Sequence, residues 1–230
     1  MEALVSSENM LFPDEIGSNG SLADSAYLRL REEIIAIELP PGTLLREDEL
    51  RKRFGVGRTP IREALQLLRH TGFVTILPRR GTLVSEINIM DLASIYEVRV
   101  HLESWAARLA AERASKDDIR AAGQLIDELQ SANRSDHYAL LALDRRVHRL
   151  AYRCAKNEHL TGTLEHYQNL SLRILHLALK RYPALIPSLE DVVDDQQALL
   201  QAICRGDADA AESMAREHVL SFERSVRELM

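Results

Sequence analysis

Four polar side chains interrupt apolar helix faces in the second half of the chain, and their types are those that bind metal ions. Asp144 and His148 are four residues apart, so both lie on one face of a predicted helix, about 6 Å apart along its axis. Gln196 and His218 interrupt two further apolar stripes. Carboxylate and imidazole groups on facing helices are how a helical bundle holds a divalent metal. Taken singly, each residue is more often a hydrogen-bonded core group than a ligand, so the residues alone leave both interpretations open.

A second candidate chemistry is the binding of a polyanion. The chain has a formal net charge of -6, yet residues 51–80 hold eight basic side chains and a single acidic one, Glu63. A local excess of this kind is typical of nucleic-acid binding, although a solvated charged face gives the same pattern. Arg58 and Arg62 are four residues apart on one helix face, so both guanidinium forks can address guanine edges in the major groove.

The elements that position these arginines are predicted to be three helices followed by a β-hairpin. The tight turn between the second and third helices is Gly55-Val56-Gly57, and the hairpin turn contains Arg79, Arg80 and Gly81. The predicted helices cover about 24–37, 46–54 and 58–70, and the predicted strands cover 73–76 and 82–85. This order is the plan of a winged helix-turn-helix, in which the first turn of the third helix enters the major groove.

Helical periodicity continues from Asn88 to the end, and no further strand is predicted. Six helices are indicated, over about 88–114, 115–131, 135–154, 157–181, 188–205 and 207–228. Their plausible N-caps are Asn88, Ser115, Ser135 and Asn157, and Pro183, Pro187 and Gly206 mark breaks. Short connections between long helices favour an antiparallel bundle. We therefore expect a mainly α fold: a flexible tail over 1–22, an N-terminal winged helix-turn-helix over 23–86 and a C-terminal all-α antiparallel six-helix bundle over 88–230.

Composition excludes several other classes. The chain has 230 residues, of which 46% are apolar and 28% charged, as in ordinary globular proteins. It has no run of about 18 apolar residues that could span a membrane, and its acidic N-terminus lacks the basic start of a signal peptide. Cys154 and Cys204 are too few for a disulfide framework. These features favour a soluble cytoplasmic protein.

The stretch PPGTLLREDELRKRFGVGRTPIREALQLLRHTGFVTILPRRGTLV resembles the winged-helix domain of GntR-family transcriptional regulators. The likeness covers essentially residues 24–85, and RTPIREAL followed by a glycine-containing wing is specific to that family. The resemblance implies DNA contacts from the recognition helix and the wing, by Arg58, Thr59, Arg62, Arg79, Arg80 and Gly81. Gly57 stands where the family commonly has Ser. Asp48 stands where some members place a DNA-contacting Arg, so the resemblance assigns no base contact to Asp48.

Residues 88–230 resemble the helical effector-binding domain, the FCD domain, of the FadR subfamily in its six-helix, VanR-like group. The segments YEVRVHLESWAARLAAERAS, DRRVHRLAYRCAKN and QQALLQAICRGDADAAESMAREH carry this likeness. Many members bind a metal, here expected to be Zn or Ni, through one Asp and three His. Asp144, His148 and His218 match three of these ligands, and Gln196 takes the place of the fourth.

The resemblance also points to residues that would meet an acidic effector. Arg99 and Glu103 match the R-x-x-x-E pattern of the family, which implies an arginine turned towards the effector; the same spacing is also that of an intrahelical salt bridge. Arg173 is a second effector-binding candidate.

Together these features indicate a transcriptional regulator, in the form of a repressor. It would bind a palindromic operator as a homodimer and sense a small carboxylate effector in its helical domain. The alternative is a metal-dependent hydrolase built on Asp144, His148 and His218. Against it, the chain has no H-E-x-x-H motif and contains a DNA-binding module that an enzyme does not need.

Overall fold

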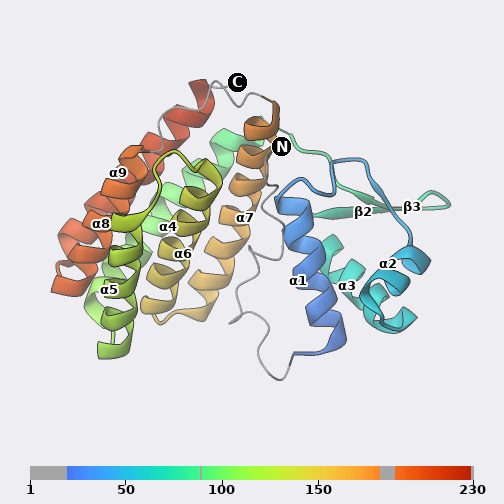
Figure 1. Cartoon of the computed structure of the whole chain (residues 1–230), viewed down its shortest axis with the longest axis horizontal. Helices are drawn as coiled ribbons and strands as arrows, with labels where there is room; N and C mark the ends of the chain where they lie inside the picture. Colours follow the sequence, from blue (N-terminus) through green and yellow to red (C-terminus); the bar gives the residue numbers. More distant parts are fainter. Residues whose placement is uncertain (1–19, 89, 182–189, 229–230) are drawn as a thin grey trace. The chain divides into compact units, whose positions relative to one another are not determined.

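The computed structural model describes residues 20–88, 90–181 and 190–228, and its contacts divide the chain into two compact units. The first unit takes the chain up to Ile89 together with Leu172–Leu177, and the second takes the remainder. None of the helices in the described ranges is both long and apolar enough to cross a membrane. Figure 1 shows the order of the elements along the chain.

The first unit consists of three helices and a small antiparallel sheet (Figure 1). Its elements are α1 (Leu22–Ile35), β1 (Leu44–Leu45), α2 (Glu47–Phe54), α3 (Arg58–His70), β2 (Val74–Leu77) and β3 (Gly81–Val84). The sheet has the order β1-β3-β2, with Leu44 and Thr75 both opposite Leu83. The winged helix-turn-helix prediction is confirmed. The sequence did not predict β1, because two residues carry no alternating pattern and the strand forms by pairing with β3.

The core of the first unit lies where α1 packs against α3. Leu30, Ile34, Ile61 and Leu68 are fully buried there, and Phe73 adds an aromatic ring beside β2. Side chains at i, i+3 and i+4 share one helix face, so the apolar periodicity of α1 and α3 forms this core directly.

Two glycines shape the chain around α3. Gly55 ends α2 in the left-handed conformation, with φ 66°, which lets the chain turn into α3 after only two further residues. Gly81 begins β3 with φ 94°, and a Cβ atom there would lie 3.1 Å from Cδ1 of Leu44. The turn of the helix-turn-helix and the base of the hairpin therefore both require glycine.

The second unit is an antiparallel bundle of helices (Figure 1). Its helices are α4 (Asp91–Arg113), α5 (Lys116–Ser131), α6 (His137–Cys154), α8 (Glu190–Arg205), α9 (Ala208–Glu228) and α7 (Glu158–Arg181) without its segment Leu172–Leu177, which belongs to the first unit. Helix α4 packs against α6, α8 and α9, and α5 packs against α6 and α8. Part of the core joins α4, α6 and α7 through Leu109, Tyr152 and Leu164. The predicted fold class, mainly α, is thus confirmed, and the described residues contain six helices after the wing, as predicted.

The predicted helix starts are right at two positions and wrong at two. Ser115 forms a capping box with Asp118, and the side chain of Asn157 accepts a hydrogen bond from the backbone N–H of Leu160. Helix α4 begins at Asp91, later than a cap at Asn88 would give, and the cap of α6 is Asp136 rather than Ser135. The carboxylate of Asp136 accepts from the backbone N–H of Ala139, so it satisfies the free donor in place of the serine. The predicted breaks at Pro183 and Pro187 and the predicted helix start at 188 lie outside the described residues.

Candidate functional site

The first candidate site is the exposed N-terminal part of α3. Gly57 is its N-cap, and the first turn contains no acidic residue. Arg58 and Thr59 are exposed in this first turn, and Arg62 is exposed one turn later. Ile61, on the opposite face, is fully buried and anchors the helix. The structure therefore presents the three predicted recognition-helix residues to solvent on a rigid element.

Carboxylates at the start of α2 contact both arginines. Nε of Arg62 donates to both carboxylate oxygens of Glu47, at 3.0 Å each. Nη2 of Arg58 lies 3.5 Å from Oδ1 of Asp48, and Asp48 also accepts from Nη1 of Arg51 at 3.1 Å. These hydrogen bonds lower the pKa of Asp48. No pattern in the sequence indicates these interhelical pairs, because they depend on the angle at which the glycine turn sets α3 against α2.

The predicted wing residues lie in and beside the turn between β2 and β3. Arg79 and Arg80 are exposed in the turn, and Arg79 has a φ of 63°. Gly81 is the first residue of β3. The three residues are accessible from solvent, as a flanking contact to DNA would require.

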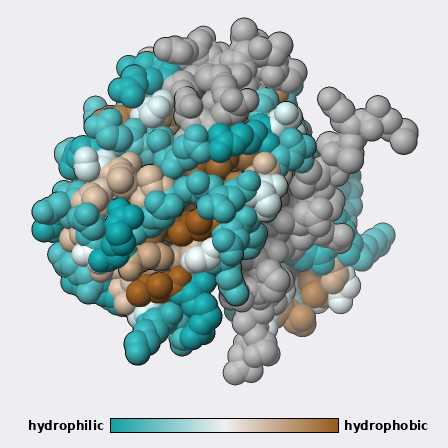
Figure 2. Space-filling model, turned by 60° about the vertical axis from the view of Figure 1, so that its left-hand side comes forward, coloured by the Kyte–Doolittle hydropathy of each residue, from teal (hydrophilic) through white to brown (hydrophobic). Residues whose placement is uncertain are grey.

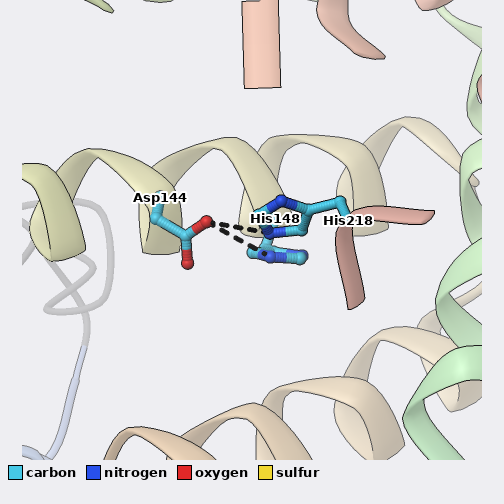
Figure 3. Close-up of side chains that lie close together, drawn as sticks. All are labelled: Asp144, His148 and His218. Carbon is cyan, nitrogen blue, oxygen red and sulfur yellow. Dashed lines mark ion pairs between the residues drawn. The ribbon is translucent and has the colours of Figure 1, made fainter. Parts of the chain in front are cut away.

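The second candidate site is a buried polar cluster inside the helical bundle. Asp144 and His148 come from α6, Gln196 from α8 and His218 from α9, and all four side chains are almost completely buried. Oδ1 of Asp144 lies 3.2 Å from Nε2 of His218 and 3.6 Å from Nε2 of His148 (Figure 3). The structure thus brings together all four residues that the sequence singled out as metal ligands.

Gln196 completes this arrangement. Its Nε2 lies 2.5 Å from Oδ1 of Asp144, 3.0 Å from Nε2 of His218 and 3.4 Å from Nε2 of His148. Its Oε1 is buried and has no hydrogen-bond partner among the described residues. A buried amide oxygen without a donor is costly, so this atom is the natural place for an added cation or hydrogen-bond donor.

Arg99 and Glu103 of α4 extend the cluster. Nε of Arg99 donates to Oε1 of Glu103 at 2.5 Å, and Oε2 of Glu103 lies 2.7 Å from Nδ1 of His148. The guanidinium group of Arg99 also lies over the ring of Tyr96, with its carbon 5.0 Å from the ring centroid. The pair is therefore more than the intrahelical salt bridge that its spacing indicates. The contact from Glu103 to His148 joins two helices, and the sequence analysis missed it.

Charges in the cluster hold one another in the ionised state. Burial alone would raise the pKa of Glu103, but Arg99 and His148 lower it to about 2. Burial would lower the pKa of His148, but the carboxylates of Glu103 and Asp144 raise it to about 9. In the same way the two imidazoles keep the pKa of Asp144 well below its usual range against the effect of burial. The cluster is thus a compact set of buried side chains in which positive and negative charges alternate.

The donor atoms fit a divalent cation. One ligand atom from each of Asp144, His148 and His218 can be chosen so that all three lie within 4.8 Å of one another. A tetrahedral site with bonds near 2.1 Å has ligand atoms about 3.4 Å apart, close to the observed 3.2 and 3.6 Å. A half-turn of the Gln196 amide would put Oε1 where Nε2 now lies and make it a fourth oxygen ligand. Glu103 would then orient His148 by accepting a hydrogen bond from Nδ1, as carboxylates commonly do beside metal-bound imidazoles.

Arg173, the other predicted effector residue, belongs to the first unit. It lies within Leu172–Leu177, is buried, and donates to the backbone oxygen of Ser85. The contacts that define the buried cluster therefore do not include Arg173.

Comparison with known proteins gives a consistent result. Residues 22–84 match the model described as "Bacterial regulatory proteins, gntR family", and residues 94–221 match the FCD domain. The regulator YdhC of Bacillus subtilis is 30% identical over 63% of this chain and 65% of its own length, and the repressor RspR of Escherichia coli is 26% identical over 88% of each chain. The solved structure of E. coli McbR/YncC has a TM-score of 0.78 at 23% identity, covering 90% of this chain and 98% of that one.

Proposed function

The chain belongs to the gntR family of bacterial regulatory proteins and carries an FCD domain, and on this premise we propose that it is a repressor that releases a palindromic operator when a small carboxylate binds its helical unit. Family and relatives are transcriptional regulators, so the protein is a regulator and the alternative of a metal-dependent hydrolase is wrong. Relatives such as RspR are named repressors, which supports repression rather than activation. The observation that carries the proposal is the exposure of Arg58, Thr59 and Arg62 at the start of α3.

DNA recognition by these residues is tested with an operator selected from a random duplex library by the wild-type protein. Arg58→Ala and Arg62→Ala should each weaken operator binding by about 1–3 kcal/mol if the lost contact is to a base. Lys52→Ala is the control, because an exposed phosphate contact should weaken all duplexes alike and flatten the salt dependence. If the protein with both arginines replaced still selects the operator over scrambled DNA, the assignment of α3 fails.

Homodimer formation follows from the size of one winged helix, which contacts too few bases for selective binding. A two-fold dimer doubles those contacts over two half-sites. Trp105, Ile119 and Tyr138 of the helical unit are exposed. Figure 2 shows hydrophobic residues at the surface among hydrophilic ones, and residues of this kind are available for self-association. Sedimentation of the full chain at micromolar concentration should give a dimer, and a folded monomer would contradict the proposal.

A divalent metal, Zn or Ni, is proposed to bind Asp144, His148 and His218, with Gln196 as the fourth ligand. Bound there, it would supply positive charge, and an anion would join the four protein ligands as a fifth one. An amide oxygen is a neutral and weak ligand, so Gln196→His should raise the affinity for Zn²⁺, and Asp144→Asn should abolish binding. Calorimetric titration of the metal-stripped protein with Zn²⁺ measures both. Equal affinities of wild type and both variants would refute this ligand set.

The effector is proposed to be a small organic acid, such as a hydroxy, keto or sugar acid. The positive groups of the metal-free cluster, Arg99 and His148, match a carboxylate; with a metal bound, His148 would be a neutral ligand and the cation would supply the positive charge in its place. A thermal-shift panel of organic acids, run with and without Zn²⁺ or Ni²⁺, tests this class. Stabilisation by neutral sugars alone, with none by any carboxylate, would contradict it. Release of the operator by the stabilising acid tests the sign of the response.

A further inference from the structure

The first turn of α2 holds three consecutive carboxylates, and two of them contact the recognition arginines. Glu47 binds Nε of Arg62 through both oxygens, and Asp48 lies 3.5 Å from Nη2 of Arg58. Glu49 instead pairs with Arg46, at 3.6 Å, three residues earlier. Only two of the three acidic side chains therefore face the residues expected to contact DNA.

These ion pairs are exposed, and this limits their strength. The exposed fractions of the side chains are 60% for Arg62, 56% for Arg58 and 70% for Asp48. Exposed pairs of this kind contribute little, so a partner with better geometry displaces them. A guanine edge offers two acceptors to one guanidinium fork, and so does a phosphate, but the first turn of the recognition helix enters the major groove, where base edges rather than phosphates lie. A matching base therefore competes with a carboxylate more effectively than the phosphates of arbitrary sequence do.

We propose that Glu47 and Asp48 act together as a specificity-determining acidic pair: Asp48 offsets the charge of Arg58 until a matching base edge replaces it, and Glu47 holds Arg62 in place for such an edge. The inference rests on the proposed function, since it concerns how the same helix distinguishes operator from other DNA. Non-specific affinity comes from cations that neutralise phosphates and release counterions. Arginines already paired with carboxylates release fewer counterions, and the carboxylates themselves repel phosphates.

The two carboxylates contribute in different ways. Glu47 is the less exposed, at 35%, and its two 3.0 Å contacts fix Arg62 through Nε, so that the two Nη groups remain for a base edge. Asp48 lies between Arg51 and Arg58 and mainly offsets their charge. Glu47 is thus a positioning residue for Arg62, and Asp48 lowers the attraction to phosphates.

The test compares Asp48→Asn and Glu47→Gln with the matched control Glu49→Gln. All three changes remove one negative charge from the same helix turn and keep the side-chain volume, but Glu49 pairs with Arg46 rather than with a recognition arginine of α3. Each full-length variant is titrated against the operator selected by the wild type and against a scrambled duplex of the same length. Fluorescence anisotropy over a series of salt concentrations gives both affinities and the salt slope, and a thermal melt confirms that each variant is folded.

Asp48→Asn should tighten binding to the scrambled duplex about threefold to tenfold at low salt and steepen the salt slope by about one ion. Operator affinity should change less, so that the ratio of the two affinities falls. Glu47→Gln should lower the same ratio, mainly by weakening operator binding. The control should shift both duplexes by one common factor and leave the ratio unchanged.

The proposal is overturned if Asp48→Asn and Glu47→Gln leave the ratio at the wild-type value, or if they change it no more than Glu49→Gln does. In that case the proposed function, including DNA recognition by α3, is not affected. If the wild type enriches no sequence from the library, the proposed function fails, and the acidic pair fails with it.

Discussion

Replacing Glu103 by Gln tests how strongly the buried cluster is tied together. The carboxylate of Glu103 lies between Arg99, at 2.5 Å, and His148, at 2.7 Å, and the residue is almost completely buried. A glutamine keeps the shape but removes the charge, so that it leaves a buried guanidinium group without its ion-pair partner. We expect Glu103→Gln to lower the free energy of unfolding substantially at pH 7.

The size of the effect follows from two independent arguments. The pKa of Glu103 falls from an ordinary value of 4.5 to about 2 in the folded protein, and a difference of this size corresponds to about 3 kcal/mol. Removing one member of a buried ion pair costs about 3–5 kcal/mol in measured cases. We therefore expect a loss of about 3–5 kcal/mol in the free energy of unfolding.

The pH dependence has a definite sign. Because the pKa of Glu103 is depressed, its contribution is present above about pH 4.5 and is lost as the pH falls towards 2. Because the pKa of His148 is raised, its contribution is present below pH 6.5 and is lost as the pH rises through about 9. The difference between wild type and Glu103→Gln should therefore be greatest between about pH 4.5 and 6.5 and smaller at both extremes.

The assay is urea unfolding of chelator-treated protein at one protein concentration, since dimerisation makes apparent stability depend on concentration. Glu112→Gln is the matched control: Glu112 pairs with Arg108 on the same helix at 3.4 Å, also four residues apart, but both side chains are substantially exposed. Its loss should cost less than about 1 kcal/mol. If the free energies of unfolding of the two variants differ by less than about 0.5 kcal/mol, the charge of Glu103 does not stabilise the cluster.

Three further predictions concern local features. Cys154 is buried with a thiol pKa raised to about 11, whereas Cys204 is half-buried, so a thiol reagent at pH 8 should label Cys204 first, as followed by mass spectrometry. Ser115→Ala removes the capping box of α5 and should cost about 1 kcal/mol in urea unfolding, and an unchanged midpoint would contradict the capping argument. Gly81→Ala places a Cβ atom at a φ of 94° and against Leu44, so it should cost about 1–3 kcal/mol and lower the thermal midpoint.

The sequence predicted helices well and boundaries less well, for physical reasons. Long helices such as α3 bury one continuous apolar stripe, and that stripe is visible as a period in the sequence. Strand β1 has only two residues and is defined by its partner β3. The predicted cap of α6 differs from the observed one by one residue. Ser135 and Asp136 are both good caps, and local propensity does not decide between neighbours.

In the candidate sites, likewise, the sequence identifies some residues, whereas contacts between helices could not be predicted from it. Asp144, His148, Gln196 and His218 could be found because a polar residue within an apolar stripe is conspicuous in the sequence. The contact of Glu103 with His148 could not be found, because it depends on how α4 packs against α6. The pairs formed by Glu47 and Asp48 likewise depend on the turn between α2 and α3. Periodicity identifies which residues face inwards, but not which residue of another helix each one meets.

The composition of the buried cluster argues for binding rather than for stability. Placing several charges in a dry core costs desolvation, and well-packed apolar side chains of similar volume are often as stabilising or more so. Around His148 the core nevertheless contains two carboxylates, an arginine and a second histidine, together with Gln196, whose Oε1 has no partner among the described residues. After a half-turn of the Gln196 amide, Oε1 and the three neighbouring ligand atoms could coordinate one cation. The proposed carboxylate effector would then complete the charge balance of the cluster.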